Sequence, residues 1–168
     1  TSKISNLISC RKYILMNKDG YIVTPSQIDN NWKKNLITAD ITKKNLIYVG
    51  RIRKEKGIYS LIELIKDETD INLTIIGADK STDKITGKNI KIVDIINNQK
   101  ELINVYDQNN ILILPSFTEG YPMVILEALS RMRPVIIFNE INHVADDRKG
   151  IFVAERNRSS LLKTIDHI

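Results

Sequence analysis

Residues 115–129 read PSFTEGYPMVILEAL, and the fold expected for this 168-residue chain is organised around them. A short apolar run, ILIL at 111–114, precedes this stretch, and a second, PVIIF at 134–138, follows it. Both have the length and composition of buried parallel strands. The pattern between them is helical, so the unit is predicted to be strand, loop, helix and strand, with the two strands parallel.

The helix of this unit is expected to begin near Gly120, because Thr118 can cap it and Pro122 fits only a first turn. Its body is apolar nearly all round, which predicts burial, and Glu127 is the exception. A buried carboxylate is unfavourable unless a partner satisfies it. Glu119 stands about 12 Å away along a helix axis, farther than the roughly 5 to 9.5 Å of a hydrolytic carboxylate pair.

This separation of the two glutamates suits the two ends of one extended ligand. The backbone around Gly120, Tyr121, Pro122 and Met123 lies between them at the expected helix N-terminus, where anions are favoured. A negative centre with a hydroxyl-rich group at each end describes a nucleotide sugar. The simpler alternative is a buried helix that tolerates one glutamate, with the side chains of Tyr121 and Met123 serving as packing groups.

The pattern Pro-Ser-x-x-Glu-Gly-Tyr-Pro-x-Val-x-Leu-Glu-Ala, with its Glu-x7-Glu spacing, resembles the retaining glycosyltransferases of the GT-B fold. The likeness is greatest to the large family four of these enzymes. It implies that Glu119 contacts the transferred sugar and that Glu127 contacts the ribose hydroxyls. It also implies that the backbone of residues 92–95 lies near the base.

A second stretch, GRIRKEKG at 50–57, resembles the Gly-Arg-x4-Lys-Gly loop of the same enzymes. In that family the two cations neutralise the diphosphate leaving group, and the resemblance implies this role for Arg51 and Lys56. Arg51 offers a planar fork and Lys56 a compact charge, and Gly50 lets the backbone approach closely. The alternative is a solvated basic loop, which most charge runs are.

The likeness runs from about Leu46 to Val153 and departs from the family in three places. The helix after the motif ends at 130–134 without the usual glycine, so its turn must be made differently. The glycine-rich loop expected after Phe138 is replaced by NEINH at 139–143, which bears on donor selectivity and activity. The family's N-terminal domain, with its acceptor site, has no counterpart, so the chain is expected to be a piece of a larger protein.

The whole chain is predicted to be a doubly wound, Rossmann-like parallel α/β sheet, one half of a GT-B enzyme. Residues 1–45 are expected to be an N-terminal arm or interdomain segment, with a hairpin formed by 13–16 and 21–23 around a turn at 17–20. Residues 46–168 are expected to be the donor-binding domain. Its predicted strands are 46–50, 73–77, 90–96, 111–114, 134–138 and 151–153, and its predicted helices are 58–65, one around 102–106, and a last one capped by Ser159 or Ser160.

Composition excludes several classes of protein. No apolar run is long enough to cross a membrane, and neither a Gly-x-Gly-x-x-Gly nor a P-loop motif occurs. The single cysteine, Cys10, favours a cytoplasmic setting, and the net charge of +5 suits a nucleotide diphosphate or an anionic inner membrane face. Nucleic acid is not expected, because no aromatic platform accompanies the scattered basic residues. His143 and His167, the only histidines, predict surface or packing roles and no metal site.

We therefore expect the nucleotide-sugar-binding, C-terminal domain of a retaining glycosyltransferase of the hexosyltransferase type. The donor needs no metal in this interpretation, the acceptor is unknown, and the isolated chain is expected to bind donor but turn over little. Two alternatives remain open at this point. One is a GT-B-like binding or regulatory module without catalytic activity, and the other is a GT-B sugar-nucleotide epimerase.

Overall fold

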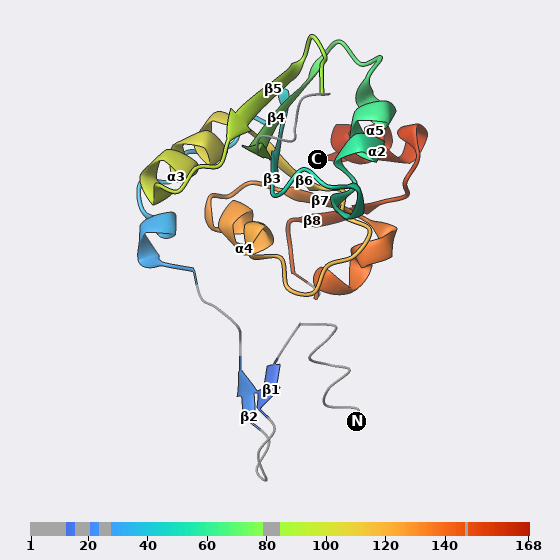
Figure 1. Cartoon of the computed structure of the whole chain (residues 1–168). Coiled ribbons are helices and arrows are strands. Elements are labelled where there is room, and N and C mark those ends of the chain that lie inside the picture. The colour runs from blue at the N-terminus through green and yellow to red at the C-terminus, as the bar shows by residue number, and fades with distance from the viewer. Residues whose placement is uncertain (1–12, 16–20, 24–27, 79–84, 147) are drawn as a thin grey trace.

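Six parallel strands form the central sheet of the computed structural model, which describes residues 13–15, 21–23, 28–78, 85–146 and 148–168 (Figure 1). The sheet has the order β5-β4-β3-β6-β7-β8 and is parallel throughout. The strands are β3 (Lys44–Val49), β4 (Ile71–Ala78), β5 (Ile90–Asp94), β6 (Ile111–Leu114), β7 (Val135–Phe138) and β8 (Ile151–Ala154). The predicted doubly wound, Rossmann-like α/β fold is confirmed.

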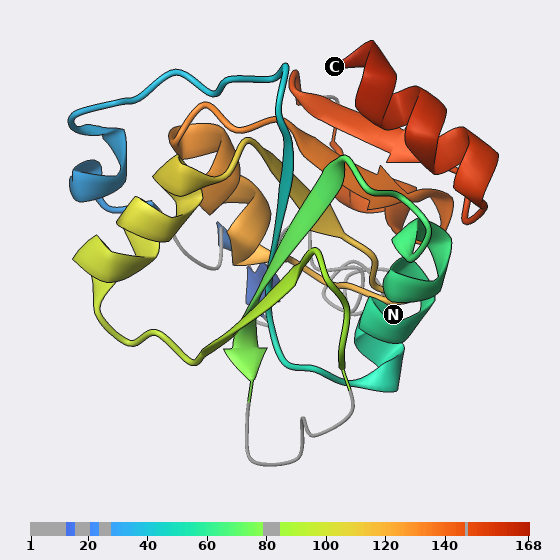
Figure 2. The same ribbon diagram turned by 90° about the horizontal axis from the view of Figure 1, so that it is seen from above.

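Helices cover both faces of this sheet (Figure 2). One face carries α2 (Ile58–Ile65) and α5 (Arg158–His167). The other carries α3 (Gln99–Gln108) and α4 (Met123–Ser130), with the short 3-10 helices η1 (Asn30–Lys33) and η3 (Asn139–Val144). A third 3-10 turn, η2 (Lys54–Lys56), leads into α2.

Strand alternation divides the apolar side chains between the two layers. In β3, Leu46 and Tyr48 pack toward α2 and α5, while Ile47 between them packs toward α3 and α4. All three are fully buried, as are the four residues of β6 and of β7 within a few per cent. Central strands buried on both faces explain why these runs are continuously apolar in the sequence.

The order of the strands creates a topological switch point between β3 and β6. The chain moves outward from β3 through β4 to β5, returns to the centre at β6, and then moves outward the other way through β7 to β8. In open parallel sheets, ligands bind outside the carboxyl ends of the strands where the order reverses. Here the loops at that place are residues 50–57 after β3 and residues 115–122 after β6. These are the two loops that the sequence motifs occupy.

Two helix starts differ from the prediction. Helix α4 begins at Met123, after Pro122 in an extended conformation, and no side chain caps it. The predicted start near Gly120 with a Thr118 cap is therefore wrong, because the residue before a proline disfavours helical backbone. Helix α5 begins at Arg158, and its cap is Asn157, whose side chain accepts a hydrogen bond from the Ser160 amide.

The end of α4 is made without glycine, as expected, and Met132 makes the turn. Its φ of 57° lies in the left-handed region, and its amide donates to the Leu129 carbonyl oxygen at 3.0 Å. The Arg133 amide returns to the Ala128 carbonyl oxygen at 2.9 Å. These two hydrogen bonds close the helix as a glycine cap would, although Met132 must adopt a backbone conformation that L-residues disfavour.

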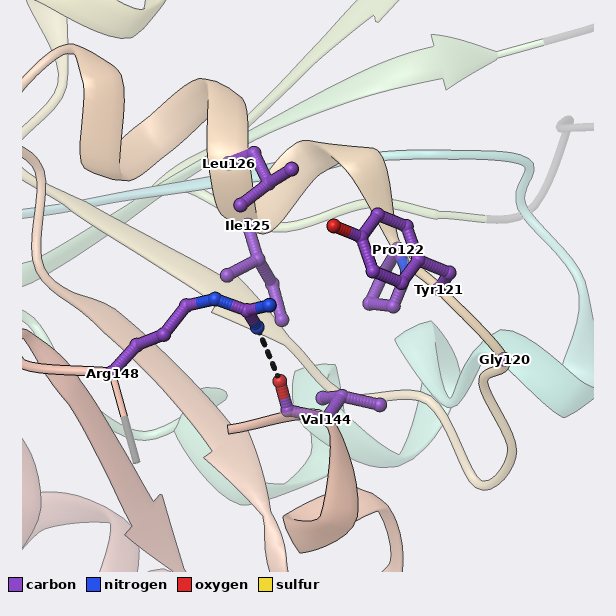
Figure 3. Close-up of a pocket in the computed structure, with 7 residues that line it drawn as sticks. All are labelled: Gly120, Tyr121, Pro122, Ile125, Leu126, Val144 and Arg148. Atoms are coloured by element: carbon purple, nitrogen blue, oxygen red, sulfur yellow. Dashed lines mark hydrogen bonds between the residues drawn. The ribbon is translucent and has the colours of Figure 1, made fainter. Parts of the chain in front are cut away.

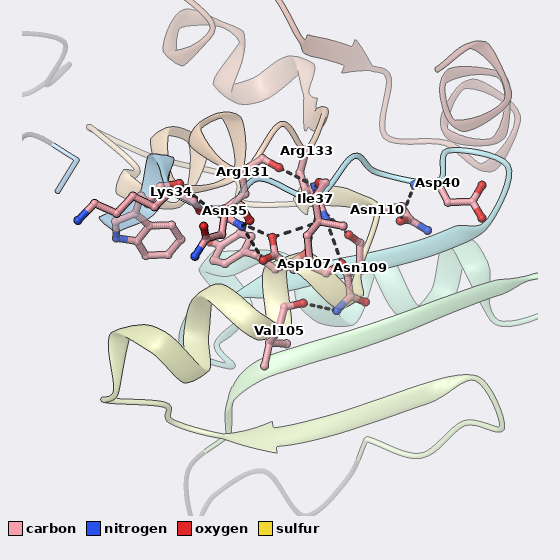
Figure 4. Close-up of polar contacts among 12 residues, drawn as sticks. Lys34, Asn35, Ile37, Asp40, Val105, Asp107, Asn109, Asn110, Arg131 and Arg133 are labelled. Atoms are coloured by element: carbon pink, nitrogen blue, oxygen red, sulfur yellow. Dashed lines mark hydrogen bonds and ion pairs between the residues drawn. The ribbon is translucent and has the colours of Figure 1, made fainter. Parts of the chain in front are cut away.

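Two buried arginines, Arg131 and Arg133, follow α4 and join three segments (Figure 4). Arg131 forms a two-pronged ion pair with Asp107, at 2.9 and 2.6 Å, and Arg133 donates to the carbonyl oxygens of Tyr106 and Asn109. Both also bind carbonyl oxygens of the segment before the sheet. These acceptors belong to Trp32, Lys34, Asn35 and Ile37.

The N-terminal part of the chain contains a separate antiparallel pair, β1 (Tyr13–Leu15) with β2 (Tyr21–Val23). The two predicted strands are confirmed, while the predicted turn at 17–20 lies outside the described residues. Within the ranges that the structure describes, no helix has the length and apolar character needed to cross a membrane.

Candidate functional site

The two predicted loops contact each other at the switch point. The Phe117 amide donates to the Glu55 carbonyl oxygen at 3.0 Å. Gly57 has a φ of 67°, and a Cβ built on it would lie 1.8 Å from the carbonyl oxygen of Pro115. Only glycine allows this approach. Gly57, which ends the first motif, must therefore be glycine, because the backbone of Pro115 at the start of the second motif packs against it.

The start of the first loop is held in a similar way by the neighbouring strand. The Gly50 amide donates to the Ile76 carbonyl oxygen at 2.9 Å. Gly77 has a φ of 115°, and a Cβ at this position would come within 2.3 Å of the Gly50 carbonyl oxygen. The glycines that close the two predicted strands thus pack backbone against backbone, which fixes the start of the basic loop.

Lys56 and Glu119 form an ion pair between the two loops. The Lys56 Nζ lies 2.6 Å from Glu119 Oε1, and the side chains are 22% and 11% exposed. The Ser116 hydroxyl donates to the same carboxylate oxygen at 2.6 Å. His143 adds a contact from η3, with Nε2 lying 3.0 Å from the Glu119 carbonyl oxygen, which accepts from the Nε2–H tautomer. Glu119 is therefore held by its backbone and by one of its two carboxylate oxygens.

Arg51 is exposed, and its guanidinium has no ion pair or hydrogen bond within the described ranges. Its carbonyl oxygen accepts a bond of 2.8 Å from the hydroxyl of Tyr48, which fixes the backbone of the loop. Burial, and then the negative charges of Glu119 and Glu55, raise the pKa of Tyr48 above its ordinary value. Tyr48 therefore stays protonated and keeps donating, while the Arg51 side chain is free to meet an anion.

Glu127 lies in the middle of α4 and is held by α3. The Tyr106 hydroxyl donates to Glu127 Oε2 at 2.9 Å. Burial raises the pKa of Glu127 above its ordinary value of 4.5, and the hydrogen bond from Tyr106 opposes that shift. The structure thus supplies the partner that a carboxylate on an apolar helix needs.

A small hollow lies beside the start of α4 (Figure 3). It is lined by three of the predicted site residues together with side chains of α4, η3 and the segment before β8: Gly120, Tyr121, Pro122, Ile125, Leu126, Val144 and Arg148. The Arg148 guanidinium donates to the Val144 carbonyl oxygen at 3.1 Å and pairs with Asp146 at 3.3 Å. Met123, the first residue of α4, does not line this hollow.

Sequence reasoning missed Arg156, which follows β8. Its guanidinium stacks between two phenyl rings, 4.0 Å from the centroid of Phe117 and 4.4 Å from that of Phe138. It pairs with Glu140 at 2.6 Å and donates to the Ser116 carbonyl oxygen at 3.2 Å. Arg156 therefore supports the loop that carries Ser116 and Glu119. Its position just past a strand, at the carboxyl edge of the sheet, is the signal that could have revealed it.

The predicted site residues come from two loops and one helix that share the carboxyl edge of the sheet. Lys56 and Glu119 are brought into contact, and Glu127 lies farther along α4 with a partner of its own. Within the described ranges, no group of three or more His, Cys, Asp or Glu side chains is arranged to hold a metal ion. The roles of these residues and the independence from metal stay predictions.

Several known proteins that resemble this chain are named glycosyltransferases. The capsular polysaccharide biosynthesis glycosyltransferase CapM of Staphylococcus aureus is 27% identical over 157 residues, covering 84% of this chain and 41% of its own length. A glycosyltransferase of Rickettsia africae superimposes with a TM-score of 0.70 at 18% identity, over 90% of this chain and 48% of that one. Anabaena HepE, solved with UDP and glucose, gives a TM-score of 0.60 at 13% identity, over 76% and 39%.

The chain spans half or less of the length of the curated relatives it matches first. The family described as "Glycosyl transferases group 1" matches residues 30–168, which is most of the sequence. The match includes both motifs, the switch-point loops and all six strands of the parallel sheet. The chain therefore belongs to the glycosyl transferases group 1 family and has the fold of the C-terminal domain of its GT-B enzymes.

Proposed function

We propose that this chain is the donor-binding domain of an enzyme that transfers a hexose from a nucleoside diphosphate sugar to an acceptor. The observation that carries the proposal is the meeting of the two motif loops at the switch point of the sheet. There a basic loop, residues 50–57, contacts the segment that leads into α4, and Lys56 of the loop pairs with Glu119 of that segment. HepE, which shares the fold, was solved with UDP and glucose, and this is consistent with a nucleotide sugar as the ligand.

The diphosphate would lie between the basic loop and the start of α4. An ammonium group has three N–H donors, and Lys56 directs one of them to Glu119, so two remain for phosphate oxygens. The unpaired guanidinium of Arg51 offers a second cation, and the amides that open α4 favour negative charge. These groups would stabilise the charge that develops on the departing diphosphate as its bond to the sugar breaks.

The two glutamates would hold the two ends of the donor. Glu119 has one carboxylate oxygen bound by Lys56 and Ser116, which leaves the other for sugar hydroxyls. Glu127 has one oxygen bound by Tyr106, which leaves the other for the ribose. Retention of the sugar's configuration, and transfer without a metal, are parts of this proposal that rest on the family likeness.

An enzyme of this kind would need a second domain to hold the acceptor. We propose that an N-terminal GT-B domain carries the acceptor site and that transfer requires the two halves to close, so that this chain alone binds donor without appreciable turnover. A cytoplasmic setting, favoured by the single cysteine, is part of this proposal, and the net charge of +5 suits an anionic membrane face.

A binding module without catalytic activity is the second candidate, and the segment after β7 favours it. Where the family has a glycine-rich loop, this chain forms the 3-10 helix η3, which places His143 against the Glu119 carbonyl oxygen. A loop built from larger residues leaves less room for close backbone contacts to a ligand. Nucleotide binding without transfer by the full-length protein would support this candidate.

The test is calorimetric titration of the chain with UDP, GDP, ADP and their common sugars. We expect one base to bind in the micromolar range, about −8 kcal/mol. Glu127→Gln should weaken that binding by about 1.5 to 3 kcal/mol, the scale of a hydrogen bond to a charged group. Glu101→Gln, an exposed change on α3, is the matched control and should bind like the wild type. Equal binding by Glu127→Gln and wild type would overturn the site assignment.

A further inference from the structure

We propose that Tyr106 is the positioning residue for Glu127, and that Trp32, from the segment before the sheet, holds Tyr106 in place. The proposal rests on the proposed function, because it concerns how the ribose end of the donor site is built. Among the described residues of the predicted site, the side chain of Tyr106 forms a hydrogen bond to the Glu127 carboxylate alone, donating its hydroxyl at 2.9 Å. Its effect on a ligand would therefore pass through Glu127.

No other described side chain shares this task. Arg131 lies one turn after Glu127 on the same side of α4 and is the nearest cation along the helix. Its guanidinium, however, is fully used, with three bonds to the carbonyl oxygens of residues 32, 34 and 35 and two to Asp107. Five donors with five bonds leave none for Glu127. Within the described ranges Tyr106 is thus the sole hydrogen-bond partner of the Glu127 carboxylate.

Tyr106 is held at its ring and at its backbone, and this orients its hydroxyl. The residue is fully buried, and its ring meets the edge of the Trp32 indole at a centroid distance of 5.4 Å and an interplanar angle of 77°. Its carbonyl oxygen accepts from Arg133 Nε at 3.1 Å. A side chain locked by packing and by a backbone bond holds its partner in a productive geometry without loss of entropy at the moment of binding.

The second carboxylate oxygen of Glu127, Oε1, is left for a ligand. Oε1 has no hydrogen-bond partner among the described residues, and it is not sealed from solvent. Tyr106 thus binds one oxygen and leaves the other available to a hydroxyl donor. Burial alone would favour the protonated acid, and the hydrogen bond from Tyr106 favours the charged form that accepts from ribose hydroxyls.

Trp32 extends this support to the segment that precedes the sheet. It is 4% exposed, although it belongs to the short helix η1, and its carbonyl oxygen is bound by Arg131 at 3.0 Å. The order of contacts is therefore Trp32 ring, Tyr106 ring, Tyr106 hydroxyl and Glu127 carboxylate. Through Trp32, the segment before the sheet would contribute to the ribose end of the donor site.

The experiment compares Tyr106→Phe with the wild type in the whole chain. The substitution keeps the ring that packs against Trp32 and removes only the hydroxyl. The ligands are the ribonucleoside diphosphate that binds best among UDP, GDP and ADP, and its 2′-deoxy counterpart. Tyr59→Phe, an exposed change on α2, is the matched control.

Tyr106→Phe should weaken binding of the ribonucleotide about 5- to 10-fold, the scale of one hydrogen bond. It should leave the 2′-deoxynucleotide within about 2-fold, so that the preference for ribose is lost. In a Glu127→Gln background the same change should have no further effect, because both act on one contact. Tyr59→Phe should change neither affinity.

A carboxyl NMR titration of Glu127 gives a second readout that needs no ligand. Removing the hydroxyl should raise the pKa of Glu127 further above its ordinary value, because burial then acts unopposed. An unchanged ribose preference in Tyr106→Phe would overturn the proposal, and so would equal weakening of both nucleotides, which indicates a packing role only. Wild-type protein that binds no nucleotide would overturn both this proposal and the proposed function.

Discussion

Lys56 and Glu119, 63 positions apart in the sequence, form an ion pair with 2.6 Å between Nζ and Oε1. The family likeness assigns these residues to different parts of a donor, the diphosphate and the sugar. In the proposed donor site, their contact would bring the leaving group and the transferred sugar next to each other, as the bond that joins them requires. It also means that Glu119 depends on Lys56 for half of the bonds to its bound oxygen, the other being from Ser116.

Lys56→Gln should weaken binding of the nucleoside diphosphate by about 1.5 to 3 kcal/mol, because a charged hydrogen bond to phosphate is lost. The corresponding nucleoside monophosphate should be affected less, since it lacks the terminal phosphate. Titration of both ligands measures the difference. Lys54→Gln removes an exposed neighbour on η2 and is the control for net charge. Equal weakening of diphosphate binding by the two substitutions would show that only the total positive charge of the loop matters.

The pH dependence of donor binding should follow Glu127. Burial raises its pKa above 4.5, so the folded protein takes up this proton at a higher pH than the unfolded chain does. The charged form accepts from the ribose, and binding should therefore weaken as the pH falls through the raised pKa. The contribution to folding has the opposite sign, because the free energy of unfolding decreases as the pH rises from the ordinary value through the raised one.

Calorimetric titrations between about pH 4 and pH 8 would test this dependence, since that window spans the ordinary pKa of a carboxyl group and the region above it. In Glu127→Gln the change in affinity over this window should be lost, because the amide does not titrate. A wild-type affinity that stays constant down to the ordinary pKa of glutamate would contradict the assignment of Glu127 to the ribose.

Asp107→Asn should destabilise the fold strongly. Asp107 is 10% exposed and accepts two bonds from Arg131, whose side chain is 1% exposed. Removing one partner of a buried ion pair leaves an uncompensated charge and costs about 3 to 5 kcal/mol. Urea unfolding would measure the free energy of unfolding. The control is Glu63→Gln, which breaks the exposed Glu63–Lys66 pair and should not shift the unfolding midpoint. An equally small effect of both substitutions would contradict this role.

Local patterns predicted the regular elements of the fold well. Helix α2 and strand β6 have the bounds that the sequence indicated, because apolar periodicity and glycine punctuation are local signals. The same signals misplaced the start of α4, where the effect of Pro122 on the preceding residue outweighs capping by Thr118.

The supporting contacts of the site could not be predicted from the sequence. Arg131 and Arg133 are charged residues in a loop, and such residues are usually exposed. Both are nevertheless buried, and both donate to carbonyl oxygens 96 to 99 positions away. Tyr106 lies in the helix predicted around 102–106, and its hydrogen bond to Glu127 spans 21 positions. No periodicity encodes a contact between two elements, so these partners emerge only once the sheet is assembled.

Met132→Gly should stabilise the protein. Met132 holds a φ of 57° at the end of α4, a conformation that costs an L-residue about 1 to 2 kcal/mol. The residue is 55% exposed, so little packing is lost. Glycine removes that strain but adds freedom to the unfolded chain, so the net gain in the free energy of unfolding should be about 0.5 to 1 kcal/mol. Urea unfolding of Lys163→Gly, an exposed site inside α5, is the control and should show a loss of about 1 kcal/mol. Opposite changes in the free energy of unfolding would distinguish relief of the strained helix end from a general effect of glycine. Destabilisation by both substitutions would show that the Met132 side chain contributes more to the fold than its exposure indicates.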